Sequence, residues 1–157
     1  MNAPNEFLLR PCRGQAEWPA LVQIWRGAVE ATHHFLTADD IDFYETKLAN
    51  EYLGLVALTV AVAENLPVGF SGIADGKLEM LFIDQQFRGR GAGSALLRAA
   101  LAAIPDLLVD VNEQNPQAVG FYHRHSFVTF GRSETDGDGR PFPLLHLRRG
   151  SAPPRPS

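Results

Sequence analysis

Cysteine is nearly absent from this sequence, since Cys12 is the only one among 157 residues. A single thiol cannot close a disulfide within the chain and cannot build a zinc site from cysteines. It also lies far upstream, on or just after a predicted first strand, and we do not expect it to act as a nucleophile. Together these points favour a reducing, cytoplasmic environment.

Long apolar runs are missing as well, because none approaches the roughly 20 residues that a membrane helix needs. Residues 1–4 lack the basic and apolar regions of a signal peptide. The sequence therefore predicts a cytoplasmic protein with no membrane partner.

The excess of one charge over the other is small. Lys and Arg number 14, Asp and Glu number 18, and the formal net charge is −4 at pH 7. This balance argues against a general nucleic-acid binder, so we expect no nucleic acid among the partners. Apolar residues make up 45% of the chain, which excludes a disordered protein and suffices for a core. We expect one domain over residues 6–149, with flexible termini at 1–5 and 150–157.

Apolar periodicity and turn signals predict about seven strands and four helices. Glu64-Asn65 and Asp75-Gly76 mark turns between strands. Thr37 and Asp40 resemble a capping box at the start of the second helix. The predicted strands are residues 7–10, 55–63, 68–73, 78–83, 107–111, 127–131 and 143–147, and the predicted helices are residues 17–32, 37–53, 92–104 and 116–125.

The order of these elements indicates the fold class. A strand, a helix and a second strand in succession form a βαβ unit, so strands 78–83 and 107–111 should be parallel. We therefore expect a three-layer α/β (α+β) domain, in which a mixed, mostly antiparallel sheet of about seven strands carries helices on both faces.

The most informative segment is residues 82–94, where a predicted strand leads through Gly89, Gly91 and Gly93 directly into a predicted helix. Glycine lets the backbone approach a ligand closely and adopt a positive φ. The free N–H groups and the positive end of the helix form an anion site, to which Arg88 and Arg90 add charged donors. The segment predicts a bound phosphate or pyrophosphate.

Other glycine-rich phosphate sites fit this segment less well. A Walker loop requires Gly-Lys-Ser/Thr, whereas Ser94 follows Gly93 here with no lysine between them. A dinucleotide fingerprint would follow the first strand of a βαβ series rather than an antiparallel meander, although Asp110 downstream keeps that alternative open. A tight turn with its arginines in solvent is the structural alternative.

Two motifs together resemble the GCN5-related N-acetyltransferase (GNAT) family. Arg88-x-x-Gly91-x-Gly93 is similar to motif A, with which that family holds the pyrophosphate of acetyl-CoA. Residues 115–127 are similar to its Asn-x-x-Ala-x-x-Phe-Tyr segment, although Ser126 stands where many members have glycine. Residues 31–36, 111–115 and 141–145 resemble the bacterial YjaB-type acetyltransferases within the family.

This resemblance implies a GNAT-like fold over nearly the whole chain, with acetyl-CoA as the co-substrate and no metal. The implied reaction is direct attack by a primary amine in a ternary complex, with a protein lysine or a small-molecule amine as acceptor. A non-catalytic acyl-CoA sensor is the alternative, and the protein is expected to be a monomer or a homodimer. The implied coenzyme-binding residues are Leu81, Phe82, Ile83, Arg88, Gly89, Arg90, Gly91, Ala92, Gly93, Ser94, Asn115 and Tyr122.

Tyr122 is the implied proton donor to the departing coenzyme sulfur. Phe121 and Tyr122 are adjacent on a predicted helix and cannot point the same way. We expect Phe121 to face the core and Tyr122 to face the coenzyme, while a purely structural role for Tyr122 as a core aromatic is the alternative. Asn115 is expected to cap the helix that starts at Pro116, and by resemblance it also touches the coenzyme.

Glu79 is the first candidate for the general base. Period-2 alternation places it on the same strand face as Leu81 and Ile83, and the resemblance puts that strand along the pantetheine arm. A hydrated surface carboxylate is an equal alternative.

Histidines are rivals of Glu79 for the role of base. The loop His33-His34-Phe35 corresponds to a region that lines the acceptor pocket in the family, although loop histidines are often plain polar residues. His123 follows Tyr122 and is expected to point elsewhere. Residues 136–139 are expected to form a turn rather than a metal site.

Overall fold

The structure is a computed structural model that describes residues 7–150. The expected flexible ends therefore lie outside the described residues, apart from Gly150. The backbone N–H of Gly150 donates to the carbonyl of Ser126 at 2.7 Å.

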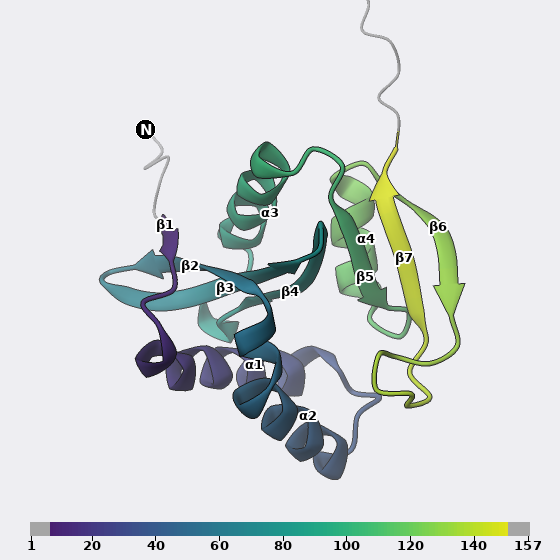
Figure 1. The fold of residues 1–157 in the computed structure, drawn as a ribbon, viewed down its shortest axis with the longest axis horizontal. Helices are drawn as coiled ribbons and strands as arrows, with labels where there is room; N and C mark the ends of the chain where they lie inside the picture. Colours follow the sequence, from purple (N-terminus) through teal and green to yellow (C-terminus); the bar gives the residue numbers. More distant parts are fainter. Residues whose placement is uncertain (1–6, 151–157) are drawn as a thin grey trace, which may run out of the picture.

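Seven strands form one sheet in the order β1-β2-β3-β4-β5-β7-β6, and helices cover both of its faces (Figure 1). Only the β4–β5 pair is parallel within the described chain. The strands are β1 (Leu8–Pro11), β2 (Ala57–Ala63), β3 (Leu66–Ala74), β4 (Lys77–Ile83), β5 (Leu108–Asn112), β6 (Phe127–Ser133) and β7 (Leu144–Arg149). The helices are α1 (Trp18–Thr32), α2 (Ala38–Asn50), α3 (Ala92–Ala103) and α4 (Pro116–Arg124), with 3-10 turns η1 (Gln15–Glu17), η2 (Tyr52–Leu55) and η3 (Gln85–Phe87).

The predicted order of elements, the parallel strand pair and the fold class are confirmed. Glu64, Asn65, Asp75 and Gly76 all have positive φ, as two-residue hairpin turns between right-twisted strands require. The capping box of α2 is present, with the Thr37 side chain accepting from the Asp40 N–H at 3.1 Å. The second helix ends at Asn50 rather than near residue 53, because the chain tightens into η2.

Alternation along β2 assigns the helices to the two faces of the sheet. Val60 and Val62 pack with α1 and α2, whereas Ala61 and Ala63 pack with Leu96 of α3. Successive side chains of a strand point to opposite faces, so α1 and α2 cover one face and α3 covers the other. Helix α4 lies on the α3 side, where Tyr122 packs with Leu97 and β5 (Figure 1).

The sheet opens between β4 and β5. These two strands pair only at Lys77 with Leu108 and at Leu78 with Val109, and they diverge beyond that point (Figure 1). The C-terminal half of β4 therefore has an unpaired edge on this side, next to α3 and α4. Unpaired strand backbone is a ready partner for an extended ligand.

Candidate active site

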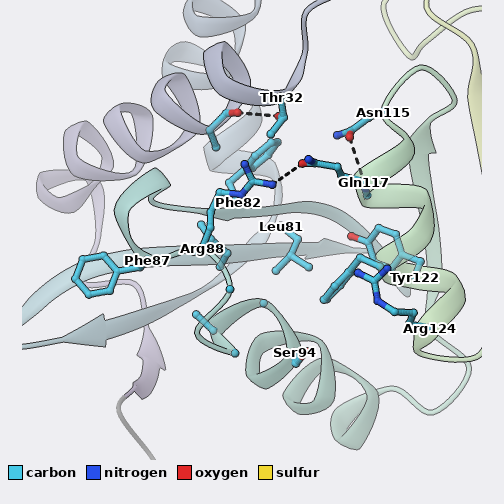
Figure 2. Close-up of a pocket in the computed structure, with 18 of the residues that line it drawn as sticks. Thr32, Leu81, Phe82, Phe87, Arg88, Ser94, Asn115, Gln117, Tyr122 and Arg124 are labelled. Atoms are coloured by element: carbon cyan, nitrogen blue, oxygen red, sulfur yellow. Dashed lines mark hydrogen bonds between the residues drawn. The ribbon is translucent and has the colours of Figure 1, made fainter.

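Two cavities, each of about 650 Å³, lie along β4. The first, here called the glycine-turn cavity, lies between β4, the residue 88–94 turn, the end of α1 and α4 (Figure 2). The second, here called the carboxylate cavity, lies between β4, α2 and the β6–β7 loop. His33 and Phe82 line both, so the two cavities meet at these residues.

The glycine turn has the backbone of an anion site. Gly89 and Gly91 have φ of 78° and 94°, and Gly91 is the left-handed N-cap of α3. A Cβ at Gly91 would meet no atom within 4 Å, so the space in front of the helix is open. The first N–H groups of α3 therefore face a cavity large enough for a ligand, and the helix dipole favours an anion there.

The two arginines of the turn behave differently. Arg88 donates to the Gln117 side chain of α4, which ties the turn to that helix across the cavity (Figure 2). The guanidinium of Arg90 lies 5.0 Å from the centre of the Phe87 ring and does not line the cavity. Apart from Arg90, every residue that the sequence suggested for coenzyme binding lines this cavity.

Tyr122 is buried, with only 6% of its surface exposed. Its ring packs edge-on against Phe121 and Phe127, and Figure 2 shows its hydroxyl directed from α4 toward β4. Burial raises the pKa of this phenol, so it keeps its proton. Phe121 also lines the cavity, where its ring lies 3.6 Å from a Cβ placed on Gly93. The expected division, with Phe121 alone in the core, is wrong, since Tyr122 is the more buried of the two.

Asn115 is buried at the start of α4. Its side chain accepts from the Ala118 N–H at 3.3 Å, which confirms the predicted helix cap, and it also lines the glycine-turn cavity (Figure 2).

The carboxylate cavity is lined by five acidic residues and one lysine, Lys77. Lys77 Nζ lies 2.9 Å from Asp110 and 3.9 Å from Glu79. Partial burial raises the pKa of Glu79, Lys77 opposes this, and Asp110 and Asp75 add to it. The acidic residues are Asp75, Glu79, Asp110, Asp136 and Asp138.

Glu79 lies in the carboxylate cavity, not the glycine-turn cavity, because a β-bulge breaks the alternation of β4. Gly72 pairs with Met80, yet Ile73 pairs with Leu78, so Glu79 is the extra residue. Leu81 and Ile83 line the glycine-turn cavity. The expected shared face of Glu79 with those residues is therefore wrong, since period-2 counting holds only in regular strands.

The β6–β7 loop closes the far side of the carboxylate cavity. Tyr44 of α2 donates to Asp136, and Tyr52 of η2 donates to Asp138. Arg140 Nη1 also contacts Asp40 at 2.8 Å. The sequence predicted only a turn here, and no local signal identified its partners, which lie 86 to 100 residues away.

The predicted loop His33-His34-Phe35 divides between different environments. His33 is buried and lines both cavities, and Phe35 lines the carboxylate cavity. His34 and His123 are both exposed, and neither residue lines either cavity. The dinucleotide alternative loses its support, because Asp110 binds Lys77 and lines the carboxylate cavity rather than the glycine turn.

Within residues 7–150, no group of three or more His, Cys, Asp or Glu side chains is placed to hold a metal ion. The same residues contain no helix that is both long and apolar enough to span a bilayer.

Comparisons with known proteins agree with this geometry. The family model for the acetyltransferase (GNAT) domain matches residues 29–143. The peptidyl-lysine N-acetyltransferase YjaB of Escherichia coli (strain K12) is 45% identical over 135 residues, which cover 83% of this chain and 89% of that protein.

Two solved structures extend the likeness. The solution structure of apo-form YjaB from Escherichia coli has a TM-score of 0.84 at 41% identity, covering 93% of this chain and 99% of the other. The PaiA N-acetyltransferase of Thermoplasma acidophilum in complex with coenzyme A has the same fold, with a TM-score of 0.74 at 17% identity over 92% of this chain and 99% of the other. The chain therefore belongs to the GNAT family, as an N-acetyltransferase that uses acetyl-CoA.

Proposed function

We propose that the protein transfers the acetyl group of acetyl-CoA to a lysine side chain of a protein acceptor, by direct attack within a complex of both substrates. The observation that carries this proposal is the carboxylate cavity, which joins the glycine-turn cavity at His33 and Phe82. A thioester in one cavity and an amine in the other would meet at that junction, and such positioning removes much of the entropic barrier.

The chemistry of the carboxylate cavity suits a cationic amine on a long chain. The five carboxylates outnumber the two lysines that pair with them, Lys77 beside Asp110 and Lys47 beside Asp138, and this excess favours an ammonium group. The aromatic rings of Tyr44, Tyr52 and Phe142 offer apolar walls for methylene groups. The names of the YjaB proteins, which describe peptidyl-lysine acetylation, support lysine as the acceptor.

The glycine-turn cavity supplies the groups that coenzyme binding requires. The N–H groups after Gly91 and the Arg88 guanidinium are suited to the pyrophosphate, and the unpaired edge of β4 at residues 81–83 is suited to the amide groups of the pantetheine arm. Acetyl-CoA supplies the activated acetyl group when bound.

Glu79 and Tyr122 are the proposed acid–base pair. A lysine amine has a pKa of about 10.4, so neutralising it at pH 7 costs roughly 4–5 kcal/mol. Glu79 lies in the acceptor cavity with a raised pKa, which suits a base that takes the first proton. Tyr122, buried and protonated beside β4, would donate to the sulfur as it leaves.

The test has two stages. Calorimetric titration with acetyl-CoA, using ATP and NAD as controls, should show binding of acetyl-CoA alone. Release of free thiol should then follow addition of a lysine peptide but not of the same peptide with arginine in place of lysine. Thiol release with spermidine but not with the peptide would indicate a small-molecule acceptor. Binding without turnover of any amine would indicate a sensor instead.

A further inference from the structure

The nitrogen of an acceptor lysine must lose two protons, because it begins as an ammonium group and ends as an amide N–H. Glu79 accounts for the first proton in the proposed function, on which this inference rests. The second leaves after attack, when the nitrogen carries a positive charge next to an electron-poor carbon and its N–H is far more acidic. A weak base suffices for that step, provided that it is neutral and faces the place of attack.

His33 stands at that place. It follows the last residue of α1, is only 8% exposed, and lines both cavities where they meet. Its ring centre lies 5.2 Å from that of Phe35, which limits how far the imidazole can turn. Of the histidines in the described chain, it alone borders either cavity.

The hydrogen bonds of Thr32 define which ring nitrogen of His33 carries the proton. Thr32 Oγ1 donates its single proton to the carbonyl of Ala28 at 2.7 Å. The 2.8 Å contact between Thr32 Oγ1 and His33 Nδ1 must therefore be donated by Nδ1. This leaves Nε2 with its lone pair free.

Nε2 of His33 is not fully buried. It has no hydrogen-bond partner among residues 7–150, and every fully buried side-chain nitrogen or oxygen in this range has one. Nε2 therefore keeps some accessible surface, and the residue lines both cavities where they meet. Burial, with a contribution from His34, lowers the pKa of His33 to about 4, so the ring is neutral at pH 7.

We propose that His33 Nε2 accepts the second proton of the attacking amine, with Thr32 as the positioning residue that holds the required tautomer. The amine lone pair forms the N–C bond while the carbonyl π pair moves to oxygen, and Nε2 takes the proton from nitrogen. The oxygen pair re-forms the carbonyl, the C–S bond breaks, and sulfur takes the Tyr122 proton. Water returns one proton from His33 to the Tyr122 phenolate, which restores both groups, and Glu79 releases the first proton to solvent water.

Chemical rescue tests this role directly. His33→Gly should lower kcat about 100-fold with little change in the Kd of acetyl-CoA or the KM of the lysine peptide. Added imidazole should restore turnover, whereas pyrrole, a ring of the same size with no basic nitrogen, should not. His123→Ala, at an exposed histidine of α4 that lines neither cavity, serves as the control and should retain full activity. Equal rescue by both rings, or an unchanged kcat, would overturn the proposal.

A second measurement requires no turnover. Nitrogen NMR of the His33 ring in the protein without substrates should show Nδ1 protonated and Nε2 unprotonated at pH 7. Thr32→Val should mix the two tautomers of His33 and lower kcat about 10-fold. Thr32→Ser keeps the hydroxyl and should preserve both the tautomer and kcat. A protonated Nε2 in the unaltered protein would refute the inference.

Failure of this inference differs from failure of the proposed function. An unaltered protein that binds acetyl-CoA but acetylates no lysine peptide contradicts the function. An active protein whose His33→Gly variant is equally active contradicts only the role of His33.

Discussion

The two cavities differ in how they are built. Most of the glycine-turn cavity comes from one continuous segment, residues 81–94, together with α4. The carboxylate cavity is assembled from α1, α2, β4, β5 and the β6–β7 loop. The phosphate of a coenzyme is the same in every reaction cycle, and a local turn can recognise it. The carboxylate cavity, where we propose that the acceptor binds, depends instead on contacts between distant segments.

If the two cavities bind their ligands independently, the largest effect on acetyl-CoA binding should come from Gly91→Val. Gly91 has φ of 94°, which a β-branched residue adopts only with strain, and its side chain would project into the open space before α3. Hydrogen bonds to a charged group contribute about 1.5–3 kcal/mol each, so loss of the phosphate cradle should raise the Kd of acetyl-CoA about 1,000-fold, which calorimetry would measure. Gly14→Val also places a β-branched residue at a positive φ, of 101°, but outside both cavities, and this variant should bind acetyl-CoA normally.

Tyr122→Phe should affect turnover and not coenzyme affinity. The substitution keeps the packing against Phe127 and removes only the hydroxyl that faces β4. We expect kcat to fall about 100-fold while the Kd of acetyl-CoA is unchanged, as measured by thiol release and calorimetry. A parallel loss of coenzyme binding would instead assign the tyrosine a structural role.

Burial of His33 where the cavities meet should make the free energy of unfolding depend on pH. The pKa of His33 is about 4 in the folded chain and about 6.5 in the unfolded chain, so the unfolded chain binds more protons between these values. Stability from this residue is fully present above pH 6.5 and decreases as pH falls, by about 2 kcal/mol between pH 7 and pH 5. Urea unfolding should show this loss in the unaltered protein but not in His33→Gln. In His34→Gln the loss should persist.

Loosening the carboxylate cavity should give the smallest effect. Tyr44→Phe combined with Tyr52→Phe removes two hydrogen bonds to the β6–β7 loop, while the contact of Arg140 with Asp40 remains. We expect the KM of the lysine peptide to rise about 10-fold with no change in the Kd of acetyl-CoA. An equal change in both constants would show that the two cavities act as one unit.

Much of the lining of the glycine-turn cavity could be predicted from the sequence because its signals are local. The glycines at positions 89, 91 and 93, where β4 leads into α3, and the cap at Asn115 all act within a few residues. Arg90 does not line the cavity, because its guanidinium lies over the nearby Phe87 ring instead. The direction of a long charged side chain could not be predicted from its place in the glycine turn.

The sequence by itself determined the order of the strands and helices, the hairpin turns and the glycine-rich turn before α3, because these depend on backbone preferences and apolar spacing over short stretches. Only the tertiary structure decided the bulge that moves Glu79 to the carboxylate cavity, the bonds from Tyr44 and Tyr52 to the β6–β7 loop, and the burial that keeps His33 neutral. Each of these depends on segments that meet after folding, and solvation and contact between such segments leave no local pattern in the chain.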